Sequence, residues 1–180
     1  MNQNYYIFTG GPGSGKTIVA NNFIKNGYAC VEEVGRQIIQ EQVKIGGHAL
    51  PWKNKLMFRD LMLQRSIETY HSMETNNIVL FDRGIPDVLG YSVLEHLPIS
   101  DDLNQAINLY SYNSRVFLFP PWLEIFENDS ERKQNYSEAV ATYHSMVNVY
   151  SGAGYDLIDV PFGNIDDRYS FILSRINSSN

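Results

Sequence analysis

Apolar and polar positions along the chain follow two alternating patterns. Five short, strongly apolar runs are each typical of a buried β-strand, and between them apolar residues recur every three or four positions, as on one face of a helix. The runs cover residues 5–8, 28–31, 78–81, 115–119 and 155–160. Because parallel strands need crossover helices, which cover both faces of the sheet, the pattern predicts a three-layer α/β domain with a five-stranded parallel sheet.

The intervening segments have recognisable helix ends. Asn26-Gly27 and Gly46-Gly47 are typical C-terminal stops, Pro86 is typical of a first helical turn, and Asn164 is a good N-cap. With these limits the expected helices are 18–24, 34–43, 53 to about 74, 86 to before 98, 101–110, 136–150 and 165–176.

The chemistry-bearing residues follow the strands. The first four strands are followed in turn by Thr9-Gly10, Glu32-Glu33, Asp82-Arg83 and Pro120-Pro121. Parallel strands end at the same edge of a sheet, and ligands of such sheets bind there. We therefore expect these residues to surround one crevice.

The first strand leads directly into a glycine-rich loop that fits the pattern G-x-x-x-x-G-K-[ST] of a P-loop (Walker A). Its glycines allow positive φ angles, so that successive backbone N–H groups turn toward an anion, and the following helix points its positive dipole end at the same place. The loop predicts a P-loop NTPase that binds a nucleoside triphosphate through Gly10, Gly11, Pro12, Gly13, Ser14, Gly15, Lys16 and Thr17.

Asp82 ends the third apolar run and is a Walker B candidate. A hard cation prefers oxygen ligands and keeps several waters, so Asp82 and the Thr17 hydroxyl together predict a Mg²⁺ site. The alternative is a helix N-cap aspartate. The chain shows no Asn-Lys-x-Asp guanine-reading pattern after a strand, which favours ATP over GTP without excluding GTP.

Charged residues near the crevice are candidates for phosphoryl transfer. Glu33 is a candidate general base and Glu32 its rival, because adjacent strand residues point to opposite faces. Arg36 and Arg83 are candidate phosphate clamps. A structural ion pair with a neighbouring acid is the other interpretation of each arginine.

Two later segments are predicted to reach the nucleotide. Residues 122–135 form a candidate lid in which Arg132 and Lys133 contact the transferred phosphate, although a solvated helix end also explains these charges. Pro161 and Phe162, after the fifth strand, are candidate contacts to the base, and an ordinary strand-to-helix turn explains them equally well.

Composition narrows the class of protein. The 180 residues carry a formal net charge of -6 and suit a single domain, 1–180. An acidic chain, with a pI of about 5.1, disfavours general nucleic-acid binding. No apolar run reaches membrane-spanning length, and only four residues precede the first strand, so we expect a cytoplasmic protein without membrane insertion.

Several motifs together resemble the AAA-labelled ATPase domains related to the ribosylnicotinamide kinase of NadR. They are Gly10 to Thr17, Glu33 to Arg36, Phe81 to Asp87, Pro120 to Trp122 and Glu131 to Gln134. The wider group includes nucleoside and nucleotide kinases and the GTP-binding translocation-defect proteins of animals. The resemblance implies the strand order 2-3-1-4-5, roles for Glu33, Asp82 and Arg83 toward acceptor and metal, and phosphate contacts from the lid, where this chain has Arg132-Lys133.

These observations lead to two hypotheses of function. The first is an ATP- and Mg²⁺-dependent, kinase-like NTPase that transfers the γ-phosphoryl group to a small hydroxyl acceptor, such as a nucleoside or nucleotide, or to water. The second is a regulatory module in which ATP or GTP orders the lid and the region of Trp122 to present a surface to a partner. The sequence leaves the acceptor and the oligomeric state open.

Overall fold

A computed structural model describes residues 2–73, 76–126 and 135–178 of the chain. Its strands form one parallel sheet in the order β2-β3-β1-β4-β5. This confirms both the parallel α/β fold and the expected strand order. The strands are β1 (Tyr5–Gly10), β2 (Ala29–Val31), β3 (Val79–Asp82), β4 (Arg115–Phe119) and β5 (Asp156–Asp159).

The helices begin and end close to the predicted positions. Gly46 ends the second helix in a left-handed conformation with φ 68, and the side chain of Asn164 caps the last helix by accepting from the Asp167 amide. The α-helices are α1 (Lys16–Lys25), α2 (Val34–Ile45), α3 (Lys55–Ser72), α4 (Ile85–Leu94), α5 (Asp101–Leu109), α6 (Tyr136–Gly152) and α7 (Ile165–Asn177), and a short 3₁₀ turn spans Leu123–Ile125.

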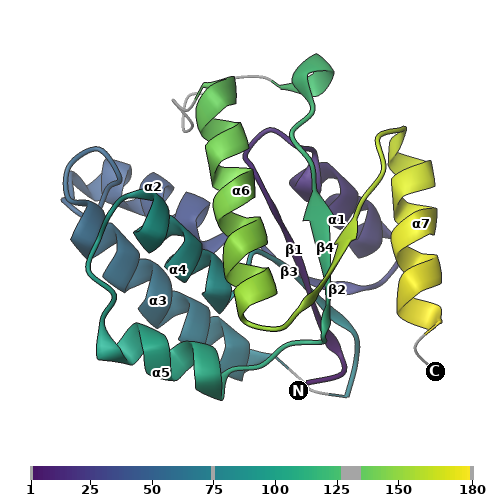
Figure 1. Ribbon diagram of the computed structural model, residues 1–180, viewed down its shortest axis with the longest axis horizontal. Coiled ribbons are helices and arrows are strands. Elements are labelled where there is room, and N and C mark those ends of the chain that lie inside the picture. Colours follow the sequence, from purple (N-terminus) through teal and green to yellow (C-terminus); the bar gives the residue numbers. More distant parts are fainter. Residues whose placement is uncertain (1, 74–75, 127–134, 179–180) are drawn as a thin grey trace.

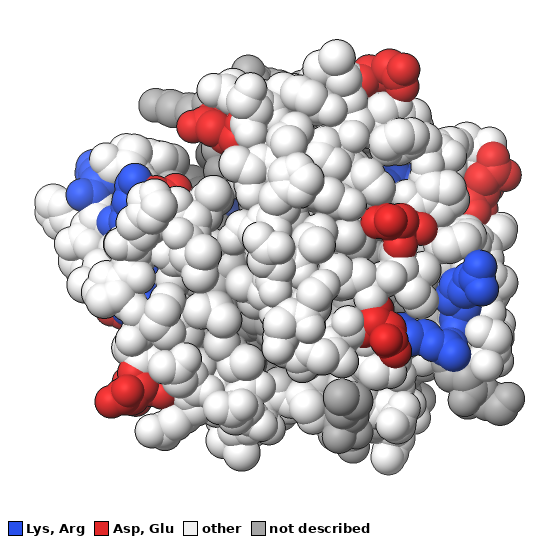
Figure 2. Space-filling view, viewed as in Figure 1, with Lys and Arg blue, Asp and Glu red and all other residues white. Residues whose placement is uncertain are grey.

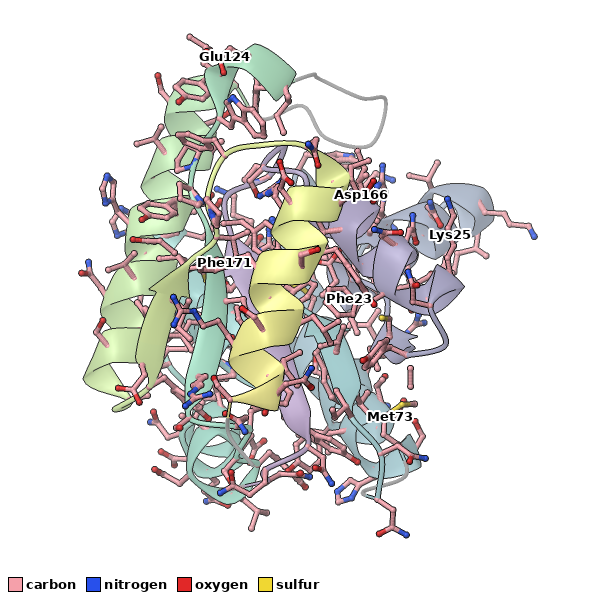
Figure 3. All side chains as sticks on the ribbon, turned by 90° about the vertical axis from the view of Figure 1, so that its right-hand side faces the viewer. Phe23, Lys25, Met73, Glu124, Asp166 and Phe171 are labelled. Atoms are coloured by element: carbon pink, nitrogen blue, oxygen red, sulfur yellow. The ribbon has the colours of Figure 1, made fainter. Side chains whose placement is uncertain are left out.

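Two helical layers cover the sheet. Figure 1 shows α3, α4, α5 and α6 on one side, with α1 and α7 together at the other. In Figure 3, which looks onto the second layer, α7 lies in front of the sheet and Phe23 of α1 is labelled beside it. The Phe23 and Tyr169 rings pack together with their centroids 4.4 Å apart and so connect the two helices of this layer.

Side chains of β1 point alternately to the two faces of the sheet, and both faces are apolar, so both must be covered by helices. Tyr5 and Ile7 point into the core beneath α3 to α6, whereas Tyr6 and Phe8 point into the core beneath α1 and α7. Central strands buried on both faces read as continuous apolar runs rather than alternating ones. The register, with Ile7 opposite both Phe81 and Val116, brings the carboxyl ends of β1, β3 and β4 to one edge.

Charge is sparse on the face that Figure 2 presents: the charged side chains described there lie mainly around its margin, and few lie over α6.

None of the described helices combines the length and apolar character that a membrane-spanning segment needs.

We predict that Ile7→Ala lowers the free energy of unfolding by about 2–5 kcal/mol, because Ile7 is fully buried in the central strand and its loss leaves a cavity. Ile24→Ala is the matched control, since Ile24 is 45% exposed on α1, and it should change stability by no more than about 0.5 kcal/mol. Urea unfolding of both variants measures the difference. Equal losses would contradict the placement of the core.

Candidate functional site

The loop after β1 has the backbone conformation that a phosphate cradle requires. Gly10, Gly13 and Gly15 adopt φ angles of 128, 71 and 81, which residues with a Cβ rarely adopt. A Cβ on Gly10 would also lie 2.3 Å from the carbonyl oxygen of Phe119. Local conformation and packing therefore both require glycine here.

Lys16 places its charge inside this loop. The side chain is 3% exposed, and its Nζ donates to the Gly11 carbonyl at 2.6 Å and to Ser14 Oγ at 3.1 Å. Helix α1 begins at Lys16, so the positive end of its dipole lies at the same point. The loop thus combines an ammonium group, a helix N-terminus and turned backbone amides, which suits a polyphosphate.

Arg168 supports the loop from α7, a role that the sequence analysis missed. Its Nη2 donates to the Ser14 carbonyl at 3.1 Å, and its guanidinium lies over the Phe119 ring at 4.8 Å. Burial lowers the pKa of Arg168. The sequence did carry a signal, because Arg168 stands at i, i+4 spacing from Ile172 and Ile176, on the buried face of an amphipathic helix.

A cavity of about 380 Å³ opens beside the loop. Its wall includes residues 13–17 of the loop, Trp122 and Ile125 after β4, and residues 163–165 before and at the start of α7. Pro161 and Phe162 are not part of this wall. Phe162 instead packs on Trp122, with ring centroids 5.0 Å apart, so its contact with a base stays a prediction.

Asp82 and Thr17 meet where the loop joins α1. The Thr17 hydroxyl donates to Asp82 Oδ2 at 2.8 Å, while Asp82 Oδ1 is buried and has no hydrogen-bond partner among the described residues. A buried carboxylate oxygen without a partner is costly, and together with a hydroxyl it fits a hard divalent cation. The described residues contain no cluster of three or more His, Cys, Asp or Glu suited to a metal, so further ligands would come from water or phosphate.

The raised pKa of the Asp82 carboxyl agrees with a site that would be stabilised by a bound cation. Burial raises the pKa of its carboxyl, and the nearby charge of Glu33 raises it further. Lys16, Arg83 and the Thr17 hydroxyl lower it, but the net shift is upward. A cation bound here would favour the ionised form.

Arg83 turns the chain from β3 toward α4 in an unusual conformation. Its φ of 77 lies in the left-handed region, which costs a residue with a Cβ about 1–3 kcal/mol. The Arg83 amide donates to the Phe8 carbonyl at 2.9 Å, and the guanidinium binds Glu33 at 3.1 Å and Asp87 at 3.0 Å. Burial lowers the pKa of Arg83, yet the surrounding carboxylates outweigh it and raise the pKa overall.

Asp87 anchors this arginine. One carboxylate oxygen accepts the Thr9 hydroxyl at 2.7 Å and Arg83, and the other accepts the Gly84 amide at 2.9 Å and the Tyr150 hydroxyl at 2.5 Å. Both oxygens are thus fully used. No local pattern in the sequence pairs Asp87 with Tyr150, because 63 positions separate them along the chain.

Of the two glutamates that follow β2, Glu33 and not Glu32 forms the ion pair with Arg83. Glu33 binds Arg83 and lines a second cavity of about 360 Å³, whereas Glu32 accepts from Gln37 at 3.3 Å. Arg36, in the first turn of α2, is the only described residue that lines both cavities. The geometry therefore places the glycine-rich loop and a Glu33–Arg83 pair on the two sides of Arg36.

The predicted lid is described only at its ends. Trp122 to Phe126 contain the 3₁₀ turn, and Ile125 reaches the loop cavity. Arg132 and Lys133 lie outside the described residues, so their predicted contact with phosphate stays a prediction.

Together the strand order, the loop and the two cavities define a kinase-like P-loop fold. A family model described as an AAA domain matches residues 5–168, and the chain belongs to that family. No curated protein matches the chain. The narrower likeness to ribosylnicotinamide kinase stays a prediction.

Solved kinase structures share the fold at low sequence identity. A deoxyadenosine kinase from M. mycoides has a TM-score of 0.69 at 16% identity, with 98% of this chain and 100% of that one covered. A thymidylate kinase from Ehrlichia chaffeensis has a TM-score of 0.62 at 15% identity, covering 98% and 100%. A shikimate kinase from Acinetobacter baumannii has a TM-score of 0.61 at 15% identity, covering 98% and 94%.

We predict that Tyr150→Phe lowers the free energy of unfolding by about 1.5–3 kcal/mol, because it removes a buried hydrogen bond to a charged carboxylate. Tyr143→Phe, the same change on the same helix, removes only an exposed 3.4 Å contact to Asp159 and should cost no more than about 0.5 kcal/mol. Urea unfolding measures both. A loss for Tyr150→Phe no greater than the control's would mean that the hydroxyl does not support Asp87.

We also predict a pH effect from Asp82 in the nucleotide-free protein. Its folded-state pKa is raised above the unfolded value of about 3.9, so the folded state binds more protons between the two values. The contribution of Asp82 to stability is therefore present below that window and is lost as pH rises through it.

Urea unfolding from about pH 4 upward measures this contribution as the difference between wild type and Asp82→Asn, since the variant lacks the titrating group. The stability of wild type relative to the variant should fall with rising pH. Parallel curves, or a difference that grows with pH, would contradict the raised pKa.

Proposed function

We propose that the protein is a Mg²⁺-dependent phosphotransferase that binds ATP and transfers its γ-phosphoryl group to a small hydroxyl acceptor. The observation that supports this best is the pair of cavities that meet at Arg36, one bordered by the P-loop and the other by Glu33 and Arg83. Phosphoryl transfer depends mainly on positioning donor and acceptor in line and on stabilising charge. Two adjoining cavities with a shared arginine suit that requirement.

On the donor side, the backbone amides of the loop from Gly10 to Thr17 would bind the triphosphate. The Lys16 ammonium would donate to phosphate oxygens in place of the Gly11 carbonyl. Thr17 and Asp82 would hold Mg²⁺. The bound ion would supply positive charge to the β- and γ-phosphate oxygens. The absence of a guanine-reading motif favours ATP, and Pro161 and Phe162 remain candidate contacts to its base.

On the acceptor side, Glu33 would accept the proton of the attacking hydroxyl, since it faces the cavity and Arg83 fixes its orientation. Arg83 is held by two carboxylates and serves mainly to position Glu33. Arg36 faces both cavities and would contact the transferred phosphoryl group. Arg132 and Lys133 of the lid would add charge there.

A nucleotide-gated binding module is the second candidate, and one observation favours it. Trp122 lines the nucleotide cavity and packs on Phe162. Phe162 is 56% exposed, and Leu123, which follows Trp122 in the chain, is 66% exposed. A nucleotide that moved Trp122 would therefore rearrange an exposed apolar surface. Slow turnover together with nucleotide-dependent capture of a partner would support this function over transfer.

We predict that Lys16→Ala weakens binding of Mg-ATP about 10- to 100-fold, the effect of losing charge-assisted contacts to phosphate. Glu33→Gln should bind Mg-ATP as wild type does, yet lower acceptor-dependent turnover by about 10²–10⁴-fold through loss of the base. Calorimetry measures the binding, and release of ADP with a panel of hydroxyl acceptors measures turnover.

Two outcomes would remove the proposal. If intact protein bound neither Mg-ATP nor Mg-GTP, the nucleotide site itself would be wrong. If no acceptor raised turnover above hydrolysis and Glu33→Gln changed nothing, transfer to a hydroxyl would be wrong while nucleotide binding stood.

A further inference from the structure

Arg168 carries a buried positive charge that no described carboxylate compensates. The residue is 4% exposed, and it forms no ion pair within the described part of the chain. Burial lowers the pKa of its guanidinium, and no neighbouring acid raises that pKa again. Buried charges are normally paired, because taking an ion out of water is costly. Arg168 therefore differs from Arg83, whose charge two carboxylates compensate.

The described contacts of the Arg168 guanidinium are with neutral groups. Nη2 donates to the Ser14 carbonyl at 3.1 Å, and the Phe119 and Trp122 ring centroids lie 4.8 and 5.7 Å from the guanidinium carbon. Nε is buried and has no hydrogen-bond partner among residues 2–73, 76–126 and 135–178. Carbonyl oxygens and aromatic rings stabilise a cation without neutralising it. A positive charge thus lies in the wall of the loop cavity, which includes Arg168.

The Ser14–Gly15 peptide connects this charge to the glycine-rich loop. A trans peptide directs its C=O and its N–H to opposite sides. Because Arg168 binds the Ser14 carbonyl, it also fixes the direction of the Gly15 N–H, which points away from the guanidinium. Hydrogen bonds in a chain polarise one another, so a charged donor on the carbonyl makes that N–H a better donor to an anion.

Gly15 leaves the space that this contact needs. A Cβ at Gly15 would lie 2.6 Å from Arg168 Nη1 and 3.3 Å from Ile125 Cδ1. The φ of Gly15, 81, is also one that residues with a Cβ rarely adopt. Glycine at this position therefore serves the approach of α7 as well as the shape of the loop.

We propose that Arg168 is a positioning residue of the nucleotide site: acting through the Ser14–Gly15 peptide, it prepares the loop for phosphate, and a bound polyphosphate supplies the missing counter-charge. The proposal rests on the nucleotide binding proposed above. It adds a residue from α7, far from the loop motif in sequence, on which that binding depends.

The variant Arg168→Met removes the charge and keeps a long side chain. Calorimetry with Mg-ATP and with magnesium and inorganic triphosphate measures affinity, at a temperature where circular dichroism shows the variant folded. Both ligands should bind about tenfold or more weakly than to wild type, and by similar factors, because the charge acts on the phosphates. Unchanged affinity for triphosphate, or a loss confined to ATP, would overturn the inference. A purely structural role would lower stability in urea without changing either affinity.

The variant Arg168→Lys keeps the charge but lacks the planar guanidinium. It should bind magnesium and triphosphate at least about threefold more tightly than Arg168→Met does. A lysine variant no better than the methionine variant would overturn the role of the charge. If Arg168→Met does not fold, the lysine variant decides: an affinity within about fivefold of wild type supports the inference, and a larger loss overturns it.

The matched control is Arg175→Met on the same helix. Arg175 lies two turns further along α7, is exposed, and packs on the Phe171 ring at 5.2 Å. Its replacement removes the same charge from α7 and should leave both affinities unchanged. A loss in the control as large as that in Arg168→Met would indicate a general effect of charge and would overturn the inference.

The outcomes separate this inference from the proposed function. If wild type bound neither Mg-ATP nor triphosphate, both would fail. If wild type bound them and Arg168→Met bound them equally well, only the inference would fail. If wild type bound them without transferring phosphate to any acceptor, the phosphotransferase proposal would fail, and the affinities of the variants would still decide the role of Arg168.

Discussion

The paired charge of Arg83, whose side chain is 17% exposed, is the constraint on which the fold and the candidate site both depend. It lies at the end of β3, and its partners come from two helices: Glu33 at the start of α2 and Asp87 in the first turn of α4. Asp87 also binds Thr9 of β1 and Tyr150 of α6. Removing Arg83 or Asp87 would leave the charge of its partner uncompensated in a largely buried setting, which costs more than the loss of a neutral member such as Tyr150. The strands and helices around the cavity beside Glu33 are therefore fixed relative to one another.

This network also explains how a strained residue persists. A left-handed conformation is unfavourable for arginine, but here it directs the guanidinium back toward Glu33 while the amide still binds β1. A glycine would adopt the turn more easily and would supply no charge. The strain is thus offset by two ion pairs and orients the candidate base.

Much of this arrangement was predictable from the sequence, because it follows from local patterns. The strand order came from a resemblance, but the parallel sheet, the helix ends and the gathering of Thr9, Glu33 and Asp82 at one edge followed from periodicity and position. What was not predictable depends on long-range contacts. Tyr150 reads as one more apolar position of α6, and nothing local indicates that its hydroxyl meets a carboxylate of α4. Arg168 is intermediate, since its place on the apolar stripe of α7 was visible but its target was not.

The two cavities differ in the charge that each can accept, and the difference arises from how their cations are held. In the loop cavity the Lys16 ammonium donates to a carbonyl and a hydroxyl of the loop, which a phosphate oxygen can replace, and its charge also acts on Asp82. In the cavity beside Glu33, Lys55 and Arg83 bind carboxylates, and replacing these partners would leave negative charge behind. An anion therefore binds more favourably on the loop side. Both cavities reach Arg36, so in the proposed transfer the partners of the cations, rather than their number, would distinguish the donor side from the acceptor side.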